Sequence, residues 1–215
     1  MSSIVEPPDF LDIGLKPYRE VWALQKKLQS ELIAGTGKQT VILCEHPAVI
    51  TLGTSADAEN VLAKEETLKE RGIEVVKIER GGDVTYHGPG QLVVYPILNL
   101  NNYRRDVDWY LRLLEGVIID TMAEFGVSGI RISGKTGVWT SPTEKIASIG
   151  VRFSRWCSMH GLALNVTTAE DGFNLINPCG FKDIKMSSLK SCGAVVDVEK
   201  VAQSLKKHLL KALGH

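Results

Sequence analysis

Residues 130–166, IRISGKTGVWTSPTEKIASIGVRFSRWCSMHGLALNV, decide the fold class of this 215-residue chain. In this stretch β-branched and apolar residues alternate with polar ones, and glycine or proline interrupts the alternation at short intervals. Alternation with a period of two is typical of strands that bury one face, and closely spaced turn residues are typical of hairpins. The stretch therefore predicts neighbouring strands that pair in the manner of an antiparallel sheet.

Three longer helical patterns lie outside this stretch. The first begins at Pro17 and ends at Gly35, and the third covers residues 198–213. The second follows Asp106, has apolar residues at spacings of three and four, and ends at Gly126. Aspartate accepts a hydrogen bond from the first turn of a helix, and glycine adopts the left-handed conformation that ends one. These signals predict three flanking helices.

The remaining regular segments are four predicted strands and one short charged helix. The strands cover residues 40–44, 49–52, 73–78 and 91–98, and the helix covers 64–71. Helices do not separate the strands regularly, so a doubly wound parallel sheet is not expected. No repeat, linker or low-complexity tract divides the chain. We therefore predict an α/β (α+β) protein with one domain over residues 1–215, built on a mixed or antiparallel sheet with flanking helices.

Composition and charge exclude several classes of protein. Twenty-five Lys and Arg balance twenty-five Asp and Glu, which argues against binding to nucleic acid. The longest apolar run has seven residues, too few to cross a membrane, and the N-terminus lacks the basic and apolar parts of a secretory signal. Four cysteines and five histidines show no zinc-ligand spacing. We expect a cytoplasmic protein with free thiols and no metal site.

The densest unusual segment is residues 80–90, RGGDVTYHGPG, between two predicted strands. Its four glycines either serve tight turns or let the backbone approach a ligand and present free N–H groups to it. The segment is expected to be a loop without regular structure, and loops of this length are usually functional or disordered.

Residues 129–136, GIRISGKT, match the phosphate-loop pattern G-x-x-x-x-G-K-[ST]. That motif binds phosphate only where a strand precedes it and a helix begins at its lysine. Here the alternation of Ile130 and Ile132 predicts a strand inside the motif, and β-like residues follow. A nucleotide-binding loop is therefore not expected.

Three further side chains are candidates for chemistry. Lys145 heads an apolar run, where the pattern alone favours an amine in water, although a buried neutral amine would act as a base. Cys179 lies between Pro178 and Gly180, so its thiol is held at a bend, and a nucleophilic role would need a nearby cation or base. His160 is either a base, a hydrogen-bonding residue or a structural histidine. Cys44, in an apolar run, is expected to be buried.

Five motifs together resemble one enzyme family. They are RGGxxTYHGPGQ at 80–91, TGVW at 136–139, KIASIG at 145–150, HGLALNV at 160–166 and FxxIxPCG at 173–180. The order and spacing of these motifs resemble those of the lipoyl(octanoyl) transferases, which are octanoyl-[acyl carrier protein]:protein N-octanoyltransferases. The resemblance extends from about Tyr18 to Leu189. The resemblance implies a fold similar to the catalytic domain of biotin and lipoate protein ligases.

The resemblance also implies a reaction, its partners and its residues. An octanoyl group would move from octanoyl-acyl carrier protein to a lysine of lipoyl domains, in 2-oxoacid dehydrogenases and the glycine cleavage H protein, without a cofactor. Cys179 would carry the acyl group as a thioester, Lys145 would be its base, and His160 is a candidate supporting residue. Lys135 receives no role. The residues implied to line the acyl site are Arg80, Gly81, Gly82, Asp83, Val84, Thr85, Tyr86, His87, Ser148, Ile149, Gly150, Gly161, Leu162 and Ala163.

The chemistry of these residue types agrees with this reaction, but three alternatives stay open. Exchange between two thiols is nearly isoenergetic, and conversion of a thioester to an amide is downhill, so no energy source is needed. An ATP-dependent lipoate or biotin ligase would carry a basic adenylate-binding loop in place of Pro-Cys-Gly. A thiol acyl hydrolase would share the Cys–Lys pair and differ only in the acceptor. A non-catalytic module that binds carrier protein would not need Cys179.

Overall fold

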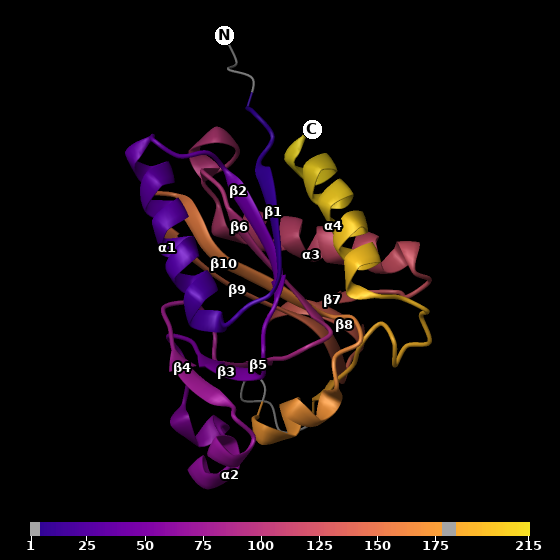
Figure 1. The fold of residues 1–215 in the computed structure, drawn as a ribbon. Helices are drawn as coiled ribbons and strands as arrows, with labels where there is room; N and C mark the ends of the chain where they lie inside the picture. Colours follow the sequence, from indigo (N-terminus) through magenta and orange to yellow (C-terminus); the bar gives the residue numbers. More distant parts are fainter. Residues whose placement is uncertain (1–4, 178–183) are drawn as a thin grey trace.

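The computed structural model describes residues 5–177 and 184–215 (Figure 1). Within these residues a mixed sheet of eight strands forms the centre of the molecule, and seven of its strands follow the order β1-β2-β6-β10-β9-β8-β7. The pairs β1–β2 and β11–β9 are parallel, and the other pairs are antiparallel. The strands are β1 (Asp9–Leu15), β2 (Thr40–Glu45), β6 (Gln91–Ile97), β7 (Ile130–Ile132), β8 (Lys135–Ser141), β9 (Glu144–Ser154), β10 (Cys157–Asn165) and β11 (Lys185–Met186). The hairpins predicted over residues 130–166 are confirmed.

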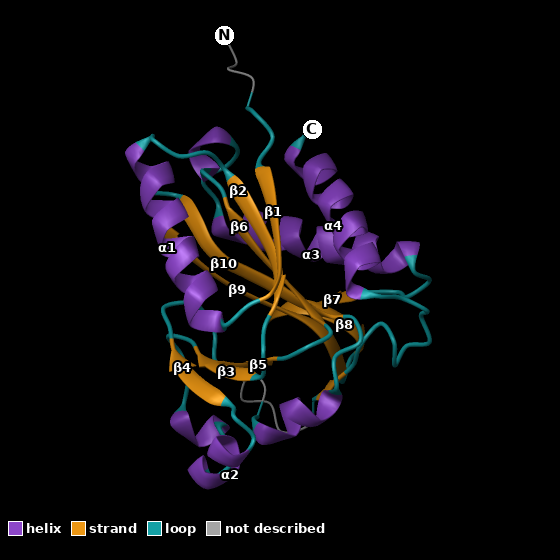
Figure 2. Ribbon diagram, in the orientation of Figure 1, coloured by secondary structure: helices purple, strands orange, loops and turns teal. Residues whose placement is uncertain are grey.

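Helices cover both faces of this sheet (Figures 1 and 2). Helix α1 (Tyr18–Ala34) lies on one face, and α3 (Val107–Glu124) and α4 (Val198–Leu213) lie on the other. The predicted helix ends are confirmed: Asp106 accepts a hydrogen bond from the Trp109 N–H at 3.0 Å, and Gly35 and Gly126 have φ of 73° and 75°. Among the described residues, none of the helices is long and apolar enough to cross a membrane.

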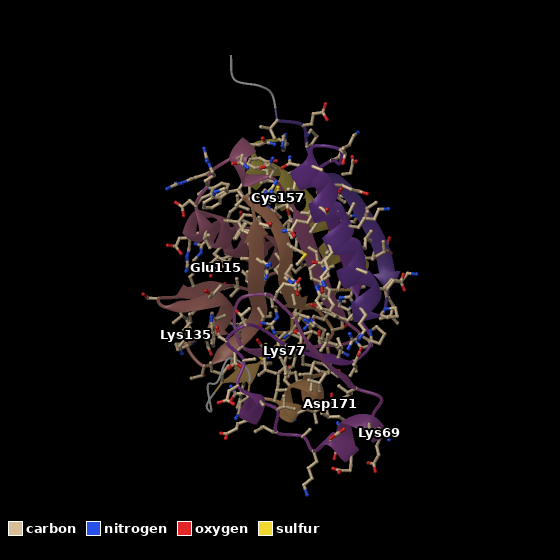
Figure 3. All side chains as sticks on the ribbon, turned by 90° about the vertical axis from the view of Figure 1, so that its left-hand side faces the viewer. Lys69, Lys77, Glu115, Lys135, Cys157 and Asp171 are labelled. Carbon is tan, nitrogen blue, oxygen red and sulfur yellow. The ribbon has the colours of Figure 1, made fainter. Side chains whose placement is uncertain are left out.

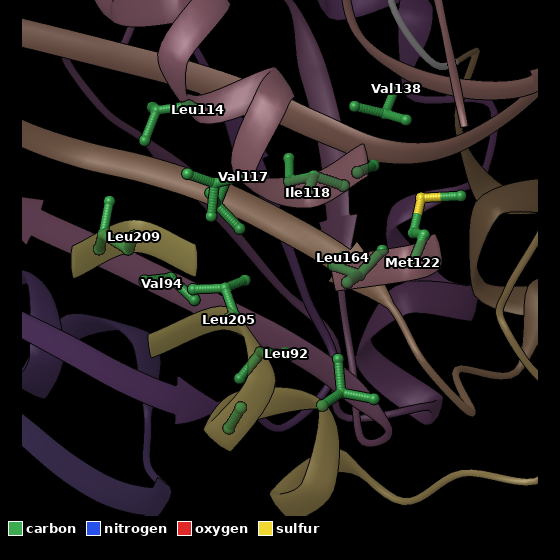
Figure 4. Packing of buried hydrophobic residues seen from close by; sticks show 14 of the residues in the cluster. Leu92, Val94, Leu114, Val117, Ile118, Met122, Val138, Leu164, Leu205 and Leu209 are labelled. Atoms are coloured by element: carbon green, nitrogen blue, oxygen red, sulfur yellow. The ribbon is translucent and has the colours of Figure 1, made fainter. Parts of the chain in front are cut away.

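The largest apolar core lies between α3, α4 and the sheet (Figure 4). Leu114 and Ile118 of α3 and Leu205 and Leu209 of α4 are almost completely buried, as is Leu164 of β10. A spacing of four residues places each helical pair on one face of its helix. Removal of this apolar surface from water is the main force that holds the two helices on the sheet.

A second, three-stranded sheet lies beside the first, in the order β4-β3-β5. Its strands are β3 (Val49–Leu52), β4 (Glu74–Lys77) and β5 (Val84–His87), and the short helix α2 (Glu65–Glu70) accompanies them. The sheet has its own apolar cluster, which includes residues of the 3₁₀ helix η3 (Glu170–Leu175). Two other 3₁₀ turns are η1 (Ala58–Asn60) and η2 (Leu100–Asn102).

Three strands depart from the sequence prediction, and one of them, the unpredicted β11, has only two residues. Strand β5 lies inside segment 80–90, which was predicted to be a loop, because four residues between glycines pair with β3. Strand β1 was not predicted, since most of its residues are exposed and its sequence, DFLDIGL, alternates weakly. Strand β1 forms because its backbone pairs in parallel with β2, and the residue pattern of β1 alone does not indicate this pairing.

Candidate active site

A cavity of about 400 Å³ lies on the α1 side of the large sheet, where the small sheet adjoins it. In Figure 3 helix α1 lies at one side of the molecule, and the β7–β8 hairpin with Lys135 lies at the other. Apart from Tyr86, all the residues implied to form the acyl site line this cavity: Arg80, Gly81, Gly82, Asp83, Val84, Thr85, His87, Ser148, Ile149, Gly150, Gly161, Leu162 and Ala163. Lys145 and His160 line it as well. Thr136 and Trp139 of the TGVW motif line the cavity too, so the fold brings four separate sequence motifs to one cavity.

Tyr86 is the predicted acyl-site residue that lies elsewhere. Its ring packs edge-on against Phe173 at 5.3 Å between centroids, and it fills the space where a side chain at Gly172 would lie. Successive side chains of a strand point to opposite faces, so Thr85 and His87 face the cavity and Tyr86 faces the apolar cluster of the small sheet.

Close backbone packing holds the loop that precedes β5 over the cavity. The Gly81 N–H donates to the Val151 carbonyl at 3.0 Å, and the Arg80 guanidinium donates to the carbonyl and hydroxyl oxygens of Thr51 at 2.8 and 3.0 Å. A Cβ at Gly150 would lie 2.8 Å from the Gly81 carbonyl oxygen. Glycine is therefore required at 150, because the loop backbone at Gly81 lies so close to it. The buried side chain of Arg80 stabilises the same loop through its bonds to Thr51.

Lys145 is buried, with 3% of its surface exposed. Its side-chain nitrogen Nζ lies 5.4 Å from the centroid of the Trp139 ring, and Gly137 leaves room for the side chain, since a Cβ there would lie 2.7 Å from Lys145 Cε. The pattern around Lys145 favoured an amine in water, and that prediction is wrong. Lys135, which received no role, also lines the cavity, and its ammonium lies 5.2 Å from the same ring.

Glu115 is a buried residue of the site's surroundings that sequence reasoning missed. It lies on α3, is fully buried, and accepts hydrogen bonds from the Gly137 N–H at 3.0 Å and from Arg131 Nε at 3.1 Å. Arg112, one turn earlier on α3, also donates to it. One carboxylate therefore fastens the β7–β8 hairpin to α3, and the hairpin in turn places Gly137 beside Lys145. The sequence signal that could have identified Glu115 is Arg112, three residues earlier, because residues at this spacing on a helix can form an ion pair.

Replacement of Glu115 by alanine will lower the free energy of unfolding by about 2 kcal/mol, because the buried Gly137 N–H loses its acceptor, while the half-exposed side chains of Arg112 and Arg131 can bond to water instead. Glu115→Gln will cost less, since its amide oxygen still accepts from the Gly137 N–H. Urea denaturation followed by circular dichroism measures both. Glu59→Ala, at an exposed glutamate, is the control and should stay within about 0.5 kcal/mol of the parent. Equal stability of Glu115→Ala and Glu59→Ala would contradict this role.

Three histidines are buried on the cavity side of the sheet. Burial, reinforced by nearby His46, lowers the pKa of His87 to about 3, and burial lowers the pKa of His160 to about 4. Burial also lowers the pKa of His46, whose Nε2 lies 2.9 Å from the Tyr95 hydroxyl. All three rings are therefore neutral at pH 7. His87 and His160 line the cavity and can offer hydrogen bonds to a ligand without adding charge, whereas the ring nitrogens of His46 already face the Lys16 carbonyl and the Tyr95 hydroxyl.

His160 has an unusual backbone that turns its ring to the cavity. Its φ is 60°, in the left-handed region, and its N–H donates to Gln25 Oε1 of α1 at 2.9 Å. The next residue, Gly161, lies against β6, where an added Cβ would be 2.8 Å from Cδ of Pro96, a residue without an N–H. Neither ring nitrogen of His160 has a hydrogen-bond partner among the described residues.

Cys179, the predicted nucleophile, lies outside the described residues. Burial raises the thiol pKa values of Cys44, Cys157 and Cys192, so none of these three is an activated thiol. The predicted burial of Cys44 is confirmed. Within residues 5–177 and 184–215, no cluster of three or more His, Cys, Asp or Glu side chains has the arrangement of a metal site.

The chain on either side of residues 178–183 is fixed by backbone hydrogen bonds. Before them, the Asn177 N–H donates to the Asn60 carbonyl at 2.8 Å. After them, β11 pairs with the start of β9, with Met186 opposite Lys145, and the Ser187 N–H donates to the Lys145 carbonyl at 2.8 Å. After residue 184 the chain thus lies on the large sheet beside Lys145.

A family model described as the lipoyl protein ligase A/B catalytic domain matches residues 17–210. The chain belongs to this family. Within the lipoyl protein ligase A/B family, an octanoyltransferase of Syntrophotalea carbinolica is 47% identical over 203 residues, which cover 94% of this chain and 92% of the relative. An octanoyltransferase of Gloeobacter violaceus is 48% identical over 192 residues, 89% of this chain and 83% of the relative. The resemblance seen in the five motifs is confirmed.

Solved structures of the lipoyl protein ligase A/B fold agree with the architecture. A lipoate-protein ligase A bound with ATP superposes with a TM-score of 0.76 at 15% identity and covers 97% of this chain and 86% of its own. A biotin protein ligase from Aquifex aeolicus superposes with a TM-score of 0.54 at 13% identity, over 97% of this chain and 69% of its own. The predicted similarity to the catalytic domains of these ligases is confirmed for the fold. The hairpin β7–β8 occupies residues 130–141, so the phosphate-loop pattern lacks its helix, as predicted.

Proposed function

We propose that this protein transfers an octanoyl group from octanoyl-acyl carrier protein to the ε-amino group of a lysine on a lipoyl domain. The observation that carries the proposal is a buried lysine in an apolar-walled cavity of about 400 Å³, in a chain 47% identical to an octanoyltransferase. Cavities of this size bind small ligands and enclose most of their surface. The solved ligases that share the fold are only 13–16% identical, so they support the architecture and not the reaction.

In the first step Cys179 acts as the nucleophile and Lys145 as the base. Lys145 accepts the thiol proton, the thiolate attacks the carbonyl carbon of the donor thioester, and the C–S bond to the carrier breaks. The carrier leaves as a thiol after it receives the proton from Lys145. A thiolate is the reactive form of cysteine, so this proton transfer is what makes Cys179 a nucleophile. One thioester replaces another, and no external energy is needed.

In the second step the lysine of the acceptor attacks the acyl-enzyme. Lys145 removes a proton from the incoming amine, the amide C–N bond forms, and the bond between the acyl carbon and Cys179 breaks. The proton returns to the cysteine sulfur, which restores the free thiol. An amide is more stable than a thioester, so the second step is downhill and drives the transfer.

The described walls of the cavity suit an acyl chain. Ile149, Leu162, Ala163 and Val93 give apolar surface from three neighbouring strands. The ring of His87 is neutral, so contact between this ring and an uncharged acyl chain does not remove a charge from water. Apolar contact of this kind rewards an octanoyl chain in proportion to the area buried.

The donor distinguishes this proposal from an ATP-dependent ligase. Incubation with octanoyl-acyl carrier protein, without ATP and with EDTA, should add one octanoyl mass to the intact protein. The adduct should be absent in Cys179→Ser and retained in Cys192→Ser, which removes an exposed cysteine. A lipoyl domain added afterwards should take up the octanoyl mass. Free octanoate with ATP and magnesium should modify neither protein.

The other outcomes identify the rival functions. Modification of the lipoyl domain by octanoate and ATP, but not by octanoyl-acyl carrier protein, would establish the ligase. Release of free octanoate from the acyl-enzyme at an equal rate with and without the lipoyl domain would establish a thiol acyl hydrolase. Binding of carrier protein without any adduct would establish a binding module. Lipoyl domains of 2-oxoacid dehydrogenases and the glycine cleavage H protein are the acceptors to test, as proteins of the same reducing cytoplasm.

A further inference from the structure

His160 and Lys145 lie at opposite ends of the cavity wall that β9 and β10 form. The residues of β9 that line the cavity lie between Lys145 and Gly150, and those of β10 lie between His160 and Ala163. The two strands are antiparallel, and His160 pairs with Val151, six residues after Lys145 on β9. At about 3.3 Å per residue, the two positions are about 20 Å apart along the strand.

The loop that precedes β5 closes the cavity at the His160 end. The Gly81 N–H donates to the carbonyl of Val151, the residue that pairs with His160, at 3.0 Å. A Cβ at Gly150 would lie 2.8 Å from the Gly81 carbonyl oxygen, so no side chain fits between the loop and β9 here. An acyl chain that runs from Lys145 along the strands therefore meets a closed end at His160.

Unpartnered polar groups gather at this closed end. His160 is 1% exposed, and neither of its ring nitrogens has a hydrogen-bond partner among the described residues. Gln25 of α1 is completely buried, and its Oε1 accepts from the His160 N–H, which can only donate. The Nε2 of Gln25 also lacks a partner in the described part of the chain. Methylene groups packed against these atoms would prevent their hydration, which costs free energy.

We propose that His160 is a specificity-determining residue that limits the acyl chain to about eight carbons, the length that ends short of its ring. The inference rests on the proposed function, because it takes the reacting carbonyl group to lie at Lys145. An extended chain of eight carbons has bonds of about 1.5 Å and spans about 9 Å, which fits between the Lys145 side chain and the His160 ring. Further methylene groups must cover or displace the ring, so they gain no affinity.

Two substitutions shorten the side chain at position 160 without opposing its backbone. His160 has φ of 60°, a conformation that glycine and asparagine adopt more readily than most residues. His160→Gly removes the ring with both nitrogens, and His160→Asn keeps a shorter polar group. Arg155→Gly is the matched control, since Arg155 has φ of 48° but is exposed and does not line the cavity. Melting temperatures identify variants that have lost the fold.

The decisive measurement is the dissociation constant of free hexanoate, octanoate and decanoate, determined by isothermal titration calorimetry. These acids bind without a covalent step, so the readout does not depend on a nucleophile. The parent should bind octanoate about 15-fold more tightly than hexanoate, because two more methylene groups are buried, and decanoate no more tightly than octanoate. His160→Gly should bind decanoate about 10-fold more tightly than octanoate. His160→Asn should show a smaller gain, and Arg155→Gly should keep the parent's ratios.

A parent protein that gains as much affinity from octanoate to decanoate as from hexanoate to octanoate would overturn the proposal, and so would a parent that binds none of the acids. Unchanged ratios in the folded His160 variants, or an equal shift in Arg155→Gly, would show that His160 sets no limit. The proposed function fails separately: if the acids bind with the expected ratios but octanoyl-acyl carrier protein leaves no adduct on the parent, the cavity selects chain length and the transfer reaction is wrong.

Discussion

Replacement of Lys145 by alanine will lower the rate of octanoyl transfer by about 10²–10⁴-fold, the range expected for the loss of a general base. Lys145→Arg will be nearly as slow, because guanidinium supplies a positive charge but does not give up its proton at neutral pH. The buried setting beside Trp139 and Gly137 also leaves little room for the larger head group. Single-turnover acylation by octanoyl-acyl carrier protein, followed by intact mass, measures both variants.

The arginine variant is the informative one, since it separates charge from proton transfer. Near-normal turnover by Lys145→Arg would show that a cation is sufficient and that the base lies elsewhere. His87 and His160 would then be the next residues to test, because both line the cavity and both are neutral at pH 7. The exposed lysine variant Lys69→Ala serves as the control and should retain the parent's rate.

The second large effect is expected from Gly137→Ala. Gly137 has φ of 121°, and a Cβ there would lie 2.6 Å from the Ala147 carbonyl oxygen and 2.7 Å from Lys145 Cε. The added methyl group must displace either strand β9 or the lysine side chain. We expect a loss of about 1–3 kcal/mol in the free energy of unfolding, typical of overpacking, and about 10²-fold in acylation rate.

Gly126→Ala is the matched control for Gly137→Ala. It has a similar left-handed backbone, with φ of 75°, but nothing lies within 4 Å of the added Cβ. This variant should lose stability from backbone strain and keep the acylation rate of the parent. Equal acylation rates in the two variants would show that glycine is needed at 137 only for its backbone conformation and does not determine the position of the Lys145 side chain.

The helices could be predicted from sequence because their signals are local. Asp106 accepts from the Trp109 N–H, and the apolar residues between Asp106 and Gly126 repeat at helical spacing. Both features depend on residues a few positions apart, so no knowledge of the rest of the chain is needed. Strand β1 had no such signal, because its hydrogen bonds come from β2 and most of its side chains are exposed.

The members of the site could be predicted by resemblance, but their surroundings could not. Lys145 is buried because Trp139 and Gly137 of the neighbouring strand enclose it, and a single-strand pattern contains no information about a neighbour. Glu115 was missed for the same reason. A glutamate inside a helix is usually solvent-exposed, and Arg131 and the Gly137 N–H reach it only after the β7–β8 hairpin has folded back on α3.

Tyr86 illustrates the limit of a motif as a guide to position. It lies between two cavity residues in sequence, yet strand geometry directs it to the opposite face. The loop predicted over segment 80–90 placed no such restriction on its direction. Once β5 pairs with β3, alternation turns the Tyr86 ring away from the cavity and into the apolar cluster of the small sheet.

The small sheet has an apolar cluster separate from the core that joins α3 and α4 to the large sheet, with members such as Ile50, Leu68 and Phe173. A unit with its own small core can open locally while the rest of the protein stays folded. We expect backbone amides of β4 and α2 to exchange with deuterium sooner than those of β6 and β10. Since β5 supplies Thr85 and His87 to the cavity, an opening of the small sheet would also expose this wall of the cavity to solvent.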